Sequence, residues 1–487
     1  MKRNLLFLLM LLGVHCAWGH DVEVDGIFYN LNQADKTASV TFQGPRFTYN
    51  EDEYVDDVVI PQSLTVEGVT YAVTSVGERC FSRCKSLNSV VLPNSVTSVG
   101  EYCFAGCDSL LSVTLPNSLT ALAPYSFANC PQLASITLPE SVTSLGDYCF
   151  TMCSSLTSIV IPNSVTSLGG YCFYGCSSLT SVTLPNSITS LPMQCFEKCT
   201  ALPTITLPAS VTSLGFQCFA SCTSMTAFTI PSTVKEMGSE CFASCSSLTS
   251  ITIPASITTL PYGCFQGCTG LTDVHLPNTL TAIGEYCFNK CTSLSSFNIP
   301  ESVTSLGSGC FQRCEALTSI AIPSSITTLE TECFAWCGRL SSVSLPKNLT
   351  SLGDYCFLEC YELRYFTVPK SVTYIGNRCF YDCINLLSIF MMPDTPPTTG
   401  QQVFTKSDLK TIYVVDEKAK ALYQAAAPWN EYNIMVTPTG IDDAQLDKDA
   451  PRITHLYDLS GKPLNGHQHG PVIVRYNDGS TRKLLLK

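Results

Sequence analysis

Charged side chains are scarce in this 487-residue chain. They make up 14% of the residues, whereas soluble domains usually carry about a quarter. Lys and Arg number 27 against 39 Asp and Glu, so the formal net charge is -12. A chain with this acidic balance lacks the cationic patch that neutralises phosphates, which argues against a nucleic-acid partner. Hydrophobic residues reach 45%, enough for a core and against global disorder.

Signatures of catalysis are also missing. The chain has six histidines, and neither a phosphate-binding loop nor a dinucleotide-binding glycine motif occurs in it. In the repetitive middle of the chain there is only His275, which stands two residues from Asp273 and therefore on the same side of an extended strand. A catalytic pair would also need an orienting group. We interpret this pair as exposed surface and predict a non-catalytic protein without a cofactor.

The only long apolar run is at the start of the chain. A positively charged beginning precedes an apolar stretch over residues 5–14, and Ala17 and Gly19 form a small-x-small pattern. This arrangement is typical of a secretory signal peptide over residues 1–19 and is too short to span a bilayer. Acylation at Cys16 is the alternative, but a histidine precedes it instead of a small residue. No later run is long enough to cross a membrane, so we predict no transmembrane segment.

The middle of the chain is an internal repeat with a fixed period. A phenylalanine stands at positions 81, 104 and 127 and recurs at the same interval as far as Phe380, and a proline recurs with the same period from Pro93 to Pro369. An unbroken period over most of a chain indicates stacked repeats instead of separate globular domains. We therefore predict a solenoid of 23-residue units over residues 73–392, in which each coil buries its apolar face against its neighbours.

One unit predicts how a coil folds. In residues 110–115 the apolar side chains end in strict alternation, which predicts a short strand, and Pro116 then terminates it. Two further apolar positions, three residues apart, predict a second wall. A glycine such as Gly100 usually follows this wall, where we expect a turn with positive φ. The Cys-Phe-x-x-Cys segment is predicted to return as a short helical or 3₁₀ turn.

Cysteine, by contrast, is abundant, with 28 residues. Apart from Cys16, all lie in the repeat, either directly before the recurring Phe or three residues after it. Continuous columns are unlike the isolated sets of four ligands that bind zinc, so we predict no metal site. Export favours disulfides, but i,i+4 pairs lie near the upper limit of bridging distance, and Cys130 has Ser126 at its partner position. We favour two columns of buried, reduced thiols, with disulfides as the alternative.

Candidate ligand-binding residues come from the surface positions of the repeat. The outward strand positions are mostly Ser and Thr, as at Ser112 and Thr114, and are either a binding face or plain soluble surface. Another column carries tyrosine in successive coils, and aromatic and Arg residues gather in the last coils; such residues are enriched at interfaces. The candidates are Tyr102, Tyr125, Tyr148, Tyr171, Trp336, Tyr361, Arg364 and Tyr365. For the tyrosines, the alternative is packing of one coil against the next.

The unit LLSVTLPNSLTALAPYSFANC at residues 110–130 resembles the BspA-like leucine-rich repeat, L-x-x-I-x-I-P-x-x-V-x-x-I-G-x-x-A-F-x-x-C. Cysteine usually replaces the alanine before Phe. The resemblance implies an N-terminal β cap over residues 20–72 and a closing cap over 393–437, with a strand at 411–415 and a helix at 417–425. It also implies a Bacteroidetes surface protein that adheres to host extracellular-matrix protein, mucosal glycan or other bacteria. The competing hypothesis is a passive surface spacer without a specific ligand.

The last segment, residues 453–487, shows apolar alternation and two turn sequences, which predict a small β-sandwich or meander. A polar, proline-flanked stretch at 438–452 is a predicted linker. The segment resembles the C-terminal sorting domain of type IX secretion substrates through YDLSGK at 457–462 and IVRY at 473–476, but has GPV at 470–472 where that family has Gly-Ile-Tyr. The resemblance implies handling by the type IX secretion machinery and a secreted or cell-surface location outside the outer membrane.

Overall fold

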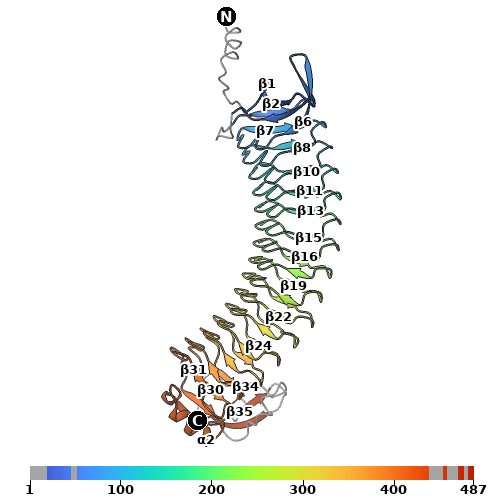
Figure 1. The fold of residues 1–487 in the computed structure, drawn as a ribbon. Coiled ribbons are helices and arrows are strands. Elements are labelled where there is room, and N and C mark those ends of the chain that lie inside the picture. Colours follow the sequence, from blue (N-terminus) through green and yellow to red (C-terminus); the bar gives the residue numbers. More distant parts are fainter. Residues whose placement is uncertain (1–18, 45–51, 438–452, 458–469, 477–480, 487) are drawn as a thin grey trace.

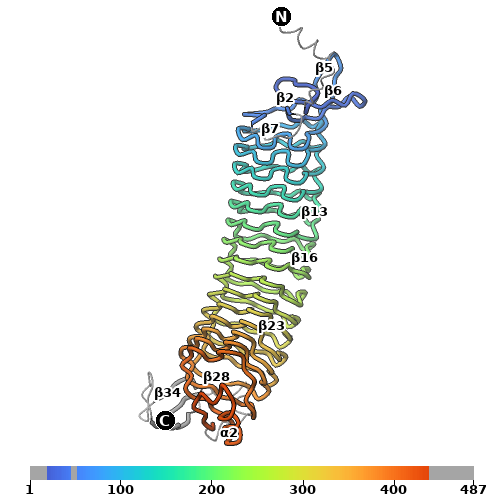
Figure 2. The backbone as a smooth tube through the Cα atoms, turned by 60° about the vertical axis from the view of Figure 1, so that its left-hand side comes forward, coloured from blue at the N-terminus to red at the C-terminus, as the bar shows by residue number. Residues whose placement is uncertain are grey.

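The computed structural model describes residues 19–44, 52–437, 453–457, 470–476 and 481–486. Short coils stack into one elongated, curved solenoid (Figure 1). Figure 2 shows the same stack from another side, with one backbone coil lying directly on the next. The predicted solenoid is confirmed. The predicted signal peptide lies outside the described residues, except for Gly19, and so does the predicted linker.

Each regular coil contributes a first strand, the one predicted before the proline. Equivalent strands of neighbouring coils pair in parallel, as Ser158 does with Ser181. Together they form the first strand face, whose members are β4 (Asp56–Val59), β7 (Leu87–Val91), β9 (Ser112–Thr114), β12 (Ser158–Val160), β14 (Ser181–Thr183), β17 (Ala227–Thr229), β19 (Ser250–Thr252), β21 (Asp273–His275), β24 (Ser319–Ala321), β26 (Ser342–Ser344), β28 (Tyr365–Val368), β30 (Ser388–Met391), β32 (Thr411–Val414) and β33 (Asn433–Val436). In the coils at 135–137, 204–206 and 296–298 the expected strand is not formed.

A second, shorter strand follows the proline in each coil. These strands also pair in parallel, as Ser144 does with Ser167. Together they form the second strand face, made of β8 (Ser98–Val99), β10 (Ala121–Leu122), β11 (Ser144–Leu145), β13 (Ser167–Leu168), β15 (Ser190–Leu191), β16 (Ser213–Leu214), β18 (Glu236–Met237), β20 (Thr259–Leu260), β22 (Ala282–Ile283), β23 (Ser305–Leu306), β25 (Thr328–Leu329), β27 (Ser351–Leu352), β29 (Tyr374–Ile375) and β31 (Thr398–Thr399). This is the predicted second wall of the coil.

A column of phenylalanine rings runs through the core. From Phe81 to Phe404 each ring stacks on the next, with centroids 5.1–5.7 Å apart and ring planes within 14° of parallel. The rings from Phe81 to Phe380 have no exposed surface. Offset stacking of buried aromatic pairs adds about 0.5–1.5 kcal/mol to the energy of burial. The column therefore links every coil to its neighbours.

At the N-terminal end the ring column continues into a β cap. Phe81 contacts Tyr54, and Tyr54 contacts Phe28. The Tyr54 hydroxyl donates to the Thr41 carbonyl, with 2.6 Å between the oxygens. The cap strands are β1 (Val22–Val24), β2 (Ile27–Asn32), β3 (Thr37–Thr41), β5 (Ser63–Val66) and β6 (Val69–Val76). Because β6 also pairs with β8 of the second strand face, the cap and the first coil share one strand.

The C-terminal end of the ring column is covered by a strand and a short helix. The strand β32 and the helix α2 (Glu417–Ala425) follow the residues predicted for them, and Asp416 caps the helix by accepting from the Ala419 N–H at 2.7 Å. Trp429, in η1 (Trp429–Glu431), packs edge-on against Phe404. Beyond residue 452, β34 (Ile453–Tyr457), β35 (Gly470–Tyr476) and β36 (Thr481–Leu486) form an antiparallel three-stranded sheet in that order.

The segment around each Phe is a run of tight turns and not a continuous helix. The Ala105 N–H donates to the Tyr102 carbonyl at 3.0 Å, which closes one turn. The backbone then adopts positive φ at two positions of each coil, as at Tyr102 (57°) and Gly106 (75°). These left-handed residues prevent the turns from continuing as a helix.

The recurring glycine does not adopt the positive φ that we expected. Gly100 and Gly169 do not have positive φ. The left-handed conformation occurs two positions later in each coil, at Tyr102 and Tyr171. Glycine is needed because the backbone of the preceding coil passes very close. A Cβ added at Gly169 would lie 2.3 Å from the Asp147 nitrogen. The expectation of a left-handed glycine was therefore wrong, and the reason for glycine is space.

Gly169→Ala is expected to lower the free energy of unfolding by about 2 kcal/mol, because the two backbones must separate to admit the new methyl group. Gly170→Ala is the matched control, since its Cβ would lie 3.3 Å from the flexible Met193 side chain, and we expect it to be nearly neutral. Denaturant unfolding of both variants measures the difference. Equal effects would contradict the explanation from backbone contact.

Candidate functional site

Four of the predicted site residues form one continuous tyrosine column. Tyr102, Tyr125, Tyr148 and Tyr171 stack face to face, with ring centroids 4.3–4.5 Å apart and ring planes within 10° of parallel. All four have φ of 57–58°, an unfavourable backbone region for residues other than glycine. The stacking between coils offsets part of that cost. The four rings therefore pack from coil to coil, which is the alternative that we considered for these residues.

Stacking decides what the tyrosine column can present to a ligand. The ring faces are covered by one another, and at the first ring by Arg79, whose guanidinium carbon lies 4.6 Å from the Tyr102 centroid. The half-buried rings therefore present edges and hydroxyl groups. Desolvation, together with hydrogen bonding to the neighbouring Tyr171, raises the pKa of Tyr148 to about 12. Its phenol keeps its proton at neutral pH and remains a hydrogen-bond donor.

A groove of about 460 Å³ runs beside the first two rings of this column. Its floor is made of the small residues Ser82, Ala105 and Ala128, of which Ser82 and Ala128 are buried. Its full lining is Arg79, Ser82, Arg83, Tyr102, Ala105, Gly106, Tyr125, Ala128 and Asn129. The far wall is the second left-handed column, represented by Arg83, Gly106 and Asn129. We call this space the arginine–tyrosine groove.

The small floor of the groove does not continue along the solenoid. Tyr174 occupies the floor column two coils beyond Ala128, and its ring lies 5.9 Å from Tyr171 across the path of the groove. Lys198 covers Tyr174, with its Nζ 4.6 Å from the ring centroid, and donates a hydrogen bond to the Tyr174 hydroxyl. The groove therefore lies against the first coils, between two arginines and an aromatic block.

Sequence reasoning found the tyrosines of this groove but missed Arg79, Arg83, Gly106 and Asn129. Reading each column of the repeat from coil to coil could have found them. The floor column runs Ser82, Ala105, Ala128, Thr151, Tyr174, so small residues give way to a large ring. That change indicates a hollow of limited length.

The other four predicted residues do not form one cluster. Trp336 lies under Arg313, whose guanidinium carbon is 4.8 Å from the ring centroid, and the Tyr361 hydroxyl donates to Glu359 at 2.5 Å. Arg364 faces Glu362 at 3.9 Å, and Tyr365, on β28, is 58% exposed. These side chains are thus divided between the turn segments and the first strand face.

The strands after Tyr365 carry an outward apolar row that the sequence reasoning missed, although Tyr365 itself pairs in register with Ser388 and not with this row. Phe390 on β30 and Tyr413 on β32 stack at 5.0 Å, and Met435 on β33 pairs in register with Tyr413. The alternation within Ser388–Met391 and Thr411–Val414 is the signal that could have placed Phe390 and Tyr413 on this outer surface. Serine and threonine occupy most equivalent positions in earlier coils.

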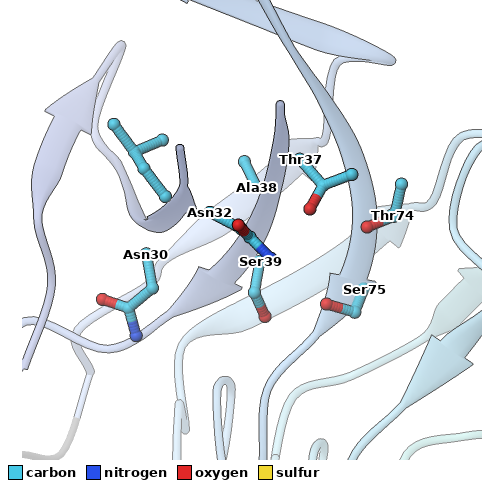
Figure 3. Close-up of a pocket in the computed structure, with 8 residues that line it drawn as sticks. Asn30, Asn32, Thr37, Ala38, Ser39, Thr74 and Ser75 are labelled. Carbon is cyan, nitrogen blue, oxygen red and sulfur yellow. The ribbon is translucent and has the colours of Figure 1, made fainter. Parts of the chain in front are cut away.

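A second hollow, of about 290 Å³, lies in the N-terminal cap between β2, β3 and β6 (Figure 3). It is located where the pairing of β3 with β6 shifts register after Ala38. Its polar lining consists of Asn30, Asn32, Thr37, Ser39, Thr74 and Ser75. No charged side chain lines it, so it offers hydrogen bonds without an anchor for a charged ligand.

The cysteines of the repeat are buried free thiols. In the column after Phe, each thiol from Cys107 to Cys383 donates to the carbonyl of a phenylalanine in the neighbouring coil, as Cys107 does to Phe81 at 3.0 Å. Burial raises the pKa of most of these thiols, and that of Cys149 well above its usual 9.0. Neutral thiols at such positions act as packing groups. Among the described residues, no group of three or more His, Cys, Asp or Glu side chains is placed to hold a metal ion.

The Asp273–His275 pair is an exposed surface pair, as we interpreted it. Asp273 Oδ2 lies 3.5 Å from His275 Nδ1 on β21, and the two side chains are 60% and 64% exposed. Solvent screens a pair of this kind. No helix in the described ranges is long and apolar enough to cross a membrane.

Stacked coils of two short parallel strands and a turn segment, with an aliphatic and phenylalanine core, define a leucine-rich-repeat solenoid. The model of the BspA type leucine rich repeat region matches residues 74–203, 189–318 and 305–426, with six copies. These stretches overlap and together cover well over half of the sequence. The chain therefore belongs to the BspA-type leucine-rich-repeat family.

Solved structures of leucine-rich-repeat proteins are similar to this chain. A leucine-rich repeat protein from Bacteroides ovatus ATCC 8483 is 25% identical, with a TM-score of 0.65 over 86% of this chain and 100% of that chain. A leucine rich cell surface protein from Faecalibacterium prausnitzii A2-165 is 28% identical over 76% of this chain and 94% of that one, with a TM-score of 0.49. No curated protein matches the chain. No enzyme family is indicated, and the leucine-rich-repeat solenoid is typically a non-catalytic scaffold.

Proposed function

We propose that this protein is a secreted or cell-surface binding protein that recognises a protein or glycan ligand without catalysing a reaction. The candidate ligands are host extracellular-matrix protein, mucosal glycan and the surfaces of other bacteria. The observation that carries the proposal is the tyrosine column Tyr102–Tyr171 beside the arginine–tyrosine groove. It joins rigid aromatic edges, phenol hydroxyls and guanidinium groups, which are side chains enriched in binding hot spots.

Export is part of this proposal. It is supported by the signal-peptide pattern in residues 1–19 and by the resemblance of residues 453–487 to a type IX sorting domain. Such a protein passes through the type IX secretion machinery and is then released or held at the cell surface. Membership of the BspA-type family is consistent with a location outside the cell.

Replacing Tyr125 and Tyr148 together with alanine is expected to weaken binding to arrayed matrix proteins or mucin glycans by about tenfold or more, because both substitutions remove a hydroxyl and ring edges from the column. Tyr286→Ala is the matched control. It occupies the same position of a later coil, also with positive φ, but outside the continuous stack. Surface plasmon resonance with the mature chain gives the affinities, and circular dichroism checks folding.

The competing function is a passive spacer. That hypothesis predicts no saturable binding to any arrayed protein or glycan, and identical behaviour of the wild type, the double variant and Tyr286→Ala. If the double variant and the wild type bind a ligand equally well and saturably, the binding site lies outside this column.

A further inference from the structure

We propose that the arginine–tyrosine groove binds an anionic saccharide, a glycan segment that carries carboxylate or sulfate groups. The inference rests on the proposed binding function and specifies the chemistry of its ligand. Arg79 and Arg83 bind the acidic groups. Tyr102, Tyr125 and Asn129 bind the sugar hydroxyls.

The charge of the groove differs from that of the whole protein. The chain has a formal net charge of -12, yet the side chains that line the groove include Arg79 and Arg83 and no acid. Arg79 is held in place by its contact with the Tyr102 ring and by an ion pair with Glu78. Lys198 lies beyond the groove, over the Tyr174 ring, and its Nζ is 3.5 Å from Glu197 Oε1. Because no acidic side chain lines the groove itself, an anionic ligand meets less repulsion there than elsewhere on this acidic surface, although Arg79 shares its charge with Glu78.

The shape of the groove suits one short segment of a sugar chain. Its volume of about 460 Å³ lies in the usual range for small-molecule sites. Ala105 and Ala128 provide an apolar floor for the carbon face of a sugar ring, and Gly106 adds no side chain to the wall. Arg83 and Asn129 are exposed at the rim. A ligand can leave the groove at the rim, as a segment within a longer glycan must.

The hydrogen-bonding groups match the same ligand. A guanidinium group can bind a carboxylate or a sulfate through two parallel N–H donors. Phenol hydroxyls both donate and accept, as does the Asn129 amide, and sugar hydroxyls require both roles. Because the tyrosine ring faces are covered by stacking, recognition depends on hydrogen bonds and charge, with no sugar ring stacked on an aromatic face.

An acidic peptide is a poorer match. Peptides often bind by adding a strand to a free edge or by inserting anchor side chains into apolar pockets. The backbone N–H groups along the groove already donate to the next coil: Arg83 to Ala105, Gly106 to Ala128, and Asn129 to Thr151, at 2.7–2.8 Å. The floor of small residues has no deep apolar pocket for an anchor.

The test is isothermal titration calorimetry on the mature chain with four probes of equal length. These are a sulfated heparin-type hexasaccharide, a galacturonic acid hexamer, neutral maltohexaose and a glutamate hexapeptide. We expect one or both acidic saccharides to bind about 30-fold more tightly than maltohexaose and the peptide, with an affinity that falls as salt is added. The heparin-type probe carries both sulfate and carboxylate groups and the galacturonic acid hexamer carries carboxylates alone, so tight binding of the first without the second shows that sulfate is required.

Two kinds of variant connect this binding to the groove. Arg79→Gln combined with Arg83→Gln is expected to cost about 30-fold in affinity for the acidic saccharide, whereas Arg378→Gln, in the same column as Arg79 but beside Tyr355, leaves it unchanged. Ala128→Tyr fills the floor without changing charge and is expected to abolish binding. Ala220→Tyr, in the same column of a later coil, is its control for folding.

The outcomes separate the two proposals. If the wild type binds an arrayed matrix protein or neutral glycan but neither acidic saccharide, this inference is overturned and the binding function stands. Preference for the glutamate peptide, or full binding by correctly folded Ala128→Tyr, also overturns it. If nothing binds saturably, the proposed function itself has failed.

Discussion

Phe219→Ala is expected to lower the free energy of unfolding by about 4 kcal/mol, the usual cost of removing a fully buried aromatic ring. Phe219 has no exposed surface, stacks on Phe196 and Phe242 at 5.6 and 5.5 Å, and meets the Phe228 ring at 5.0 Å. The substitution leaves a cavity and removes three ring contacts at once. Guanidinium unfolding followed by circular dichroism measures the loss.

The position of Phe219 in the middle of the array adds a second expected result. Coils contact only their neighbours, so stability depends on each interface between adjacent coils. A weak interface in the middle allows the two halves to unfold separately, and the unfolding curve should broaden or divide. Phe216→Ala is the control, because this ring, three residues away, is 41% exposed and its loss should cost under about 1 kcal/mol. Similar losses for the two variants would contradict a stabilising role for the ring column.

Alkaline pH is expected to unfold the solenoid from about pH 9 upward. Burial raises the pKa of thiols such as Cys195 and Cys264 well above the usual 9.0. The folded chain therefore keeps protons that the unfolded chain releases, so the stabilisation is complete below about pH 9 and is lost as the pH rises. One unit higher, each such thiol costs the folded state about 1.4 kcal/mol. Summed over the cysteine columns, this is comparable with the stability of the whole chain.

The measurement is circular dichroism against pH, without oxygen, with a return to neutral pH to show reversibility. The controls replace Cys149, Cys195 and Cys264 with alanine, the residue at this position in the BspA-like pattern. Each substitution removes one titrating group, so the midpoint should rise with the number replaced. Buried tyrosines also titrate at high pH, but their contribution is the same in all variants. A midpoint that does not respond to the substitutions would refute the role of the thiols.

Most of the fold could be predicted because the position of a residue within the repeat determines where it lies in the folded coil. Residues one repeat apart lie on top of one another, so the Phe81–Phe380 column, the cysteine columns and the outward Ser/Thr positions were all visible in the sequence. The capping helix Glu417–Ala425 was also predicted correctly. The coils at 135–137 and 204–206 keep their apolar alternation but do not form regular strands. The alternation of apolar residues specifies which side chains are buried, but it does not determine whether neighbouring backbones pair as regular strands.

The candidate site was only partly predictable. The tyrosine column could be recognised from its spacing, but the covering of its ring faces depends on a separation of about 4.4 Å between neighbouring rings. The groove depends on two left-handed columns and the small floor between them. The last four candidates lie in neighbouring coils of the sequence, yet Tyr365 faces outward from β28 while Trp336 lies on a turn.

The period, the buried columns and the low charge of this protein can be read directly from its sequence, because residues one repeat apart occupy equivalent places in neighbouring coils. The reason that glycine recurs, the tyrosine surfaces that stay open and the location of the groove became clear only from the folded chain. Those properties depend on the distance between adjacent backbones and on the rotamers of side chains that stack across it. Composition and spacing specify which residues meet, but only the three-dimensional packing sets how closely they approach and which faces of their side chains touch.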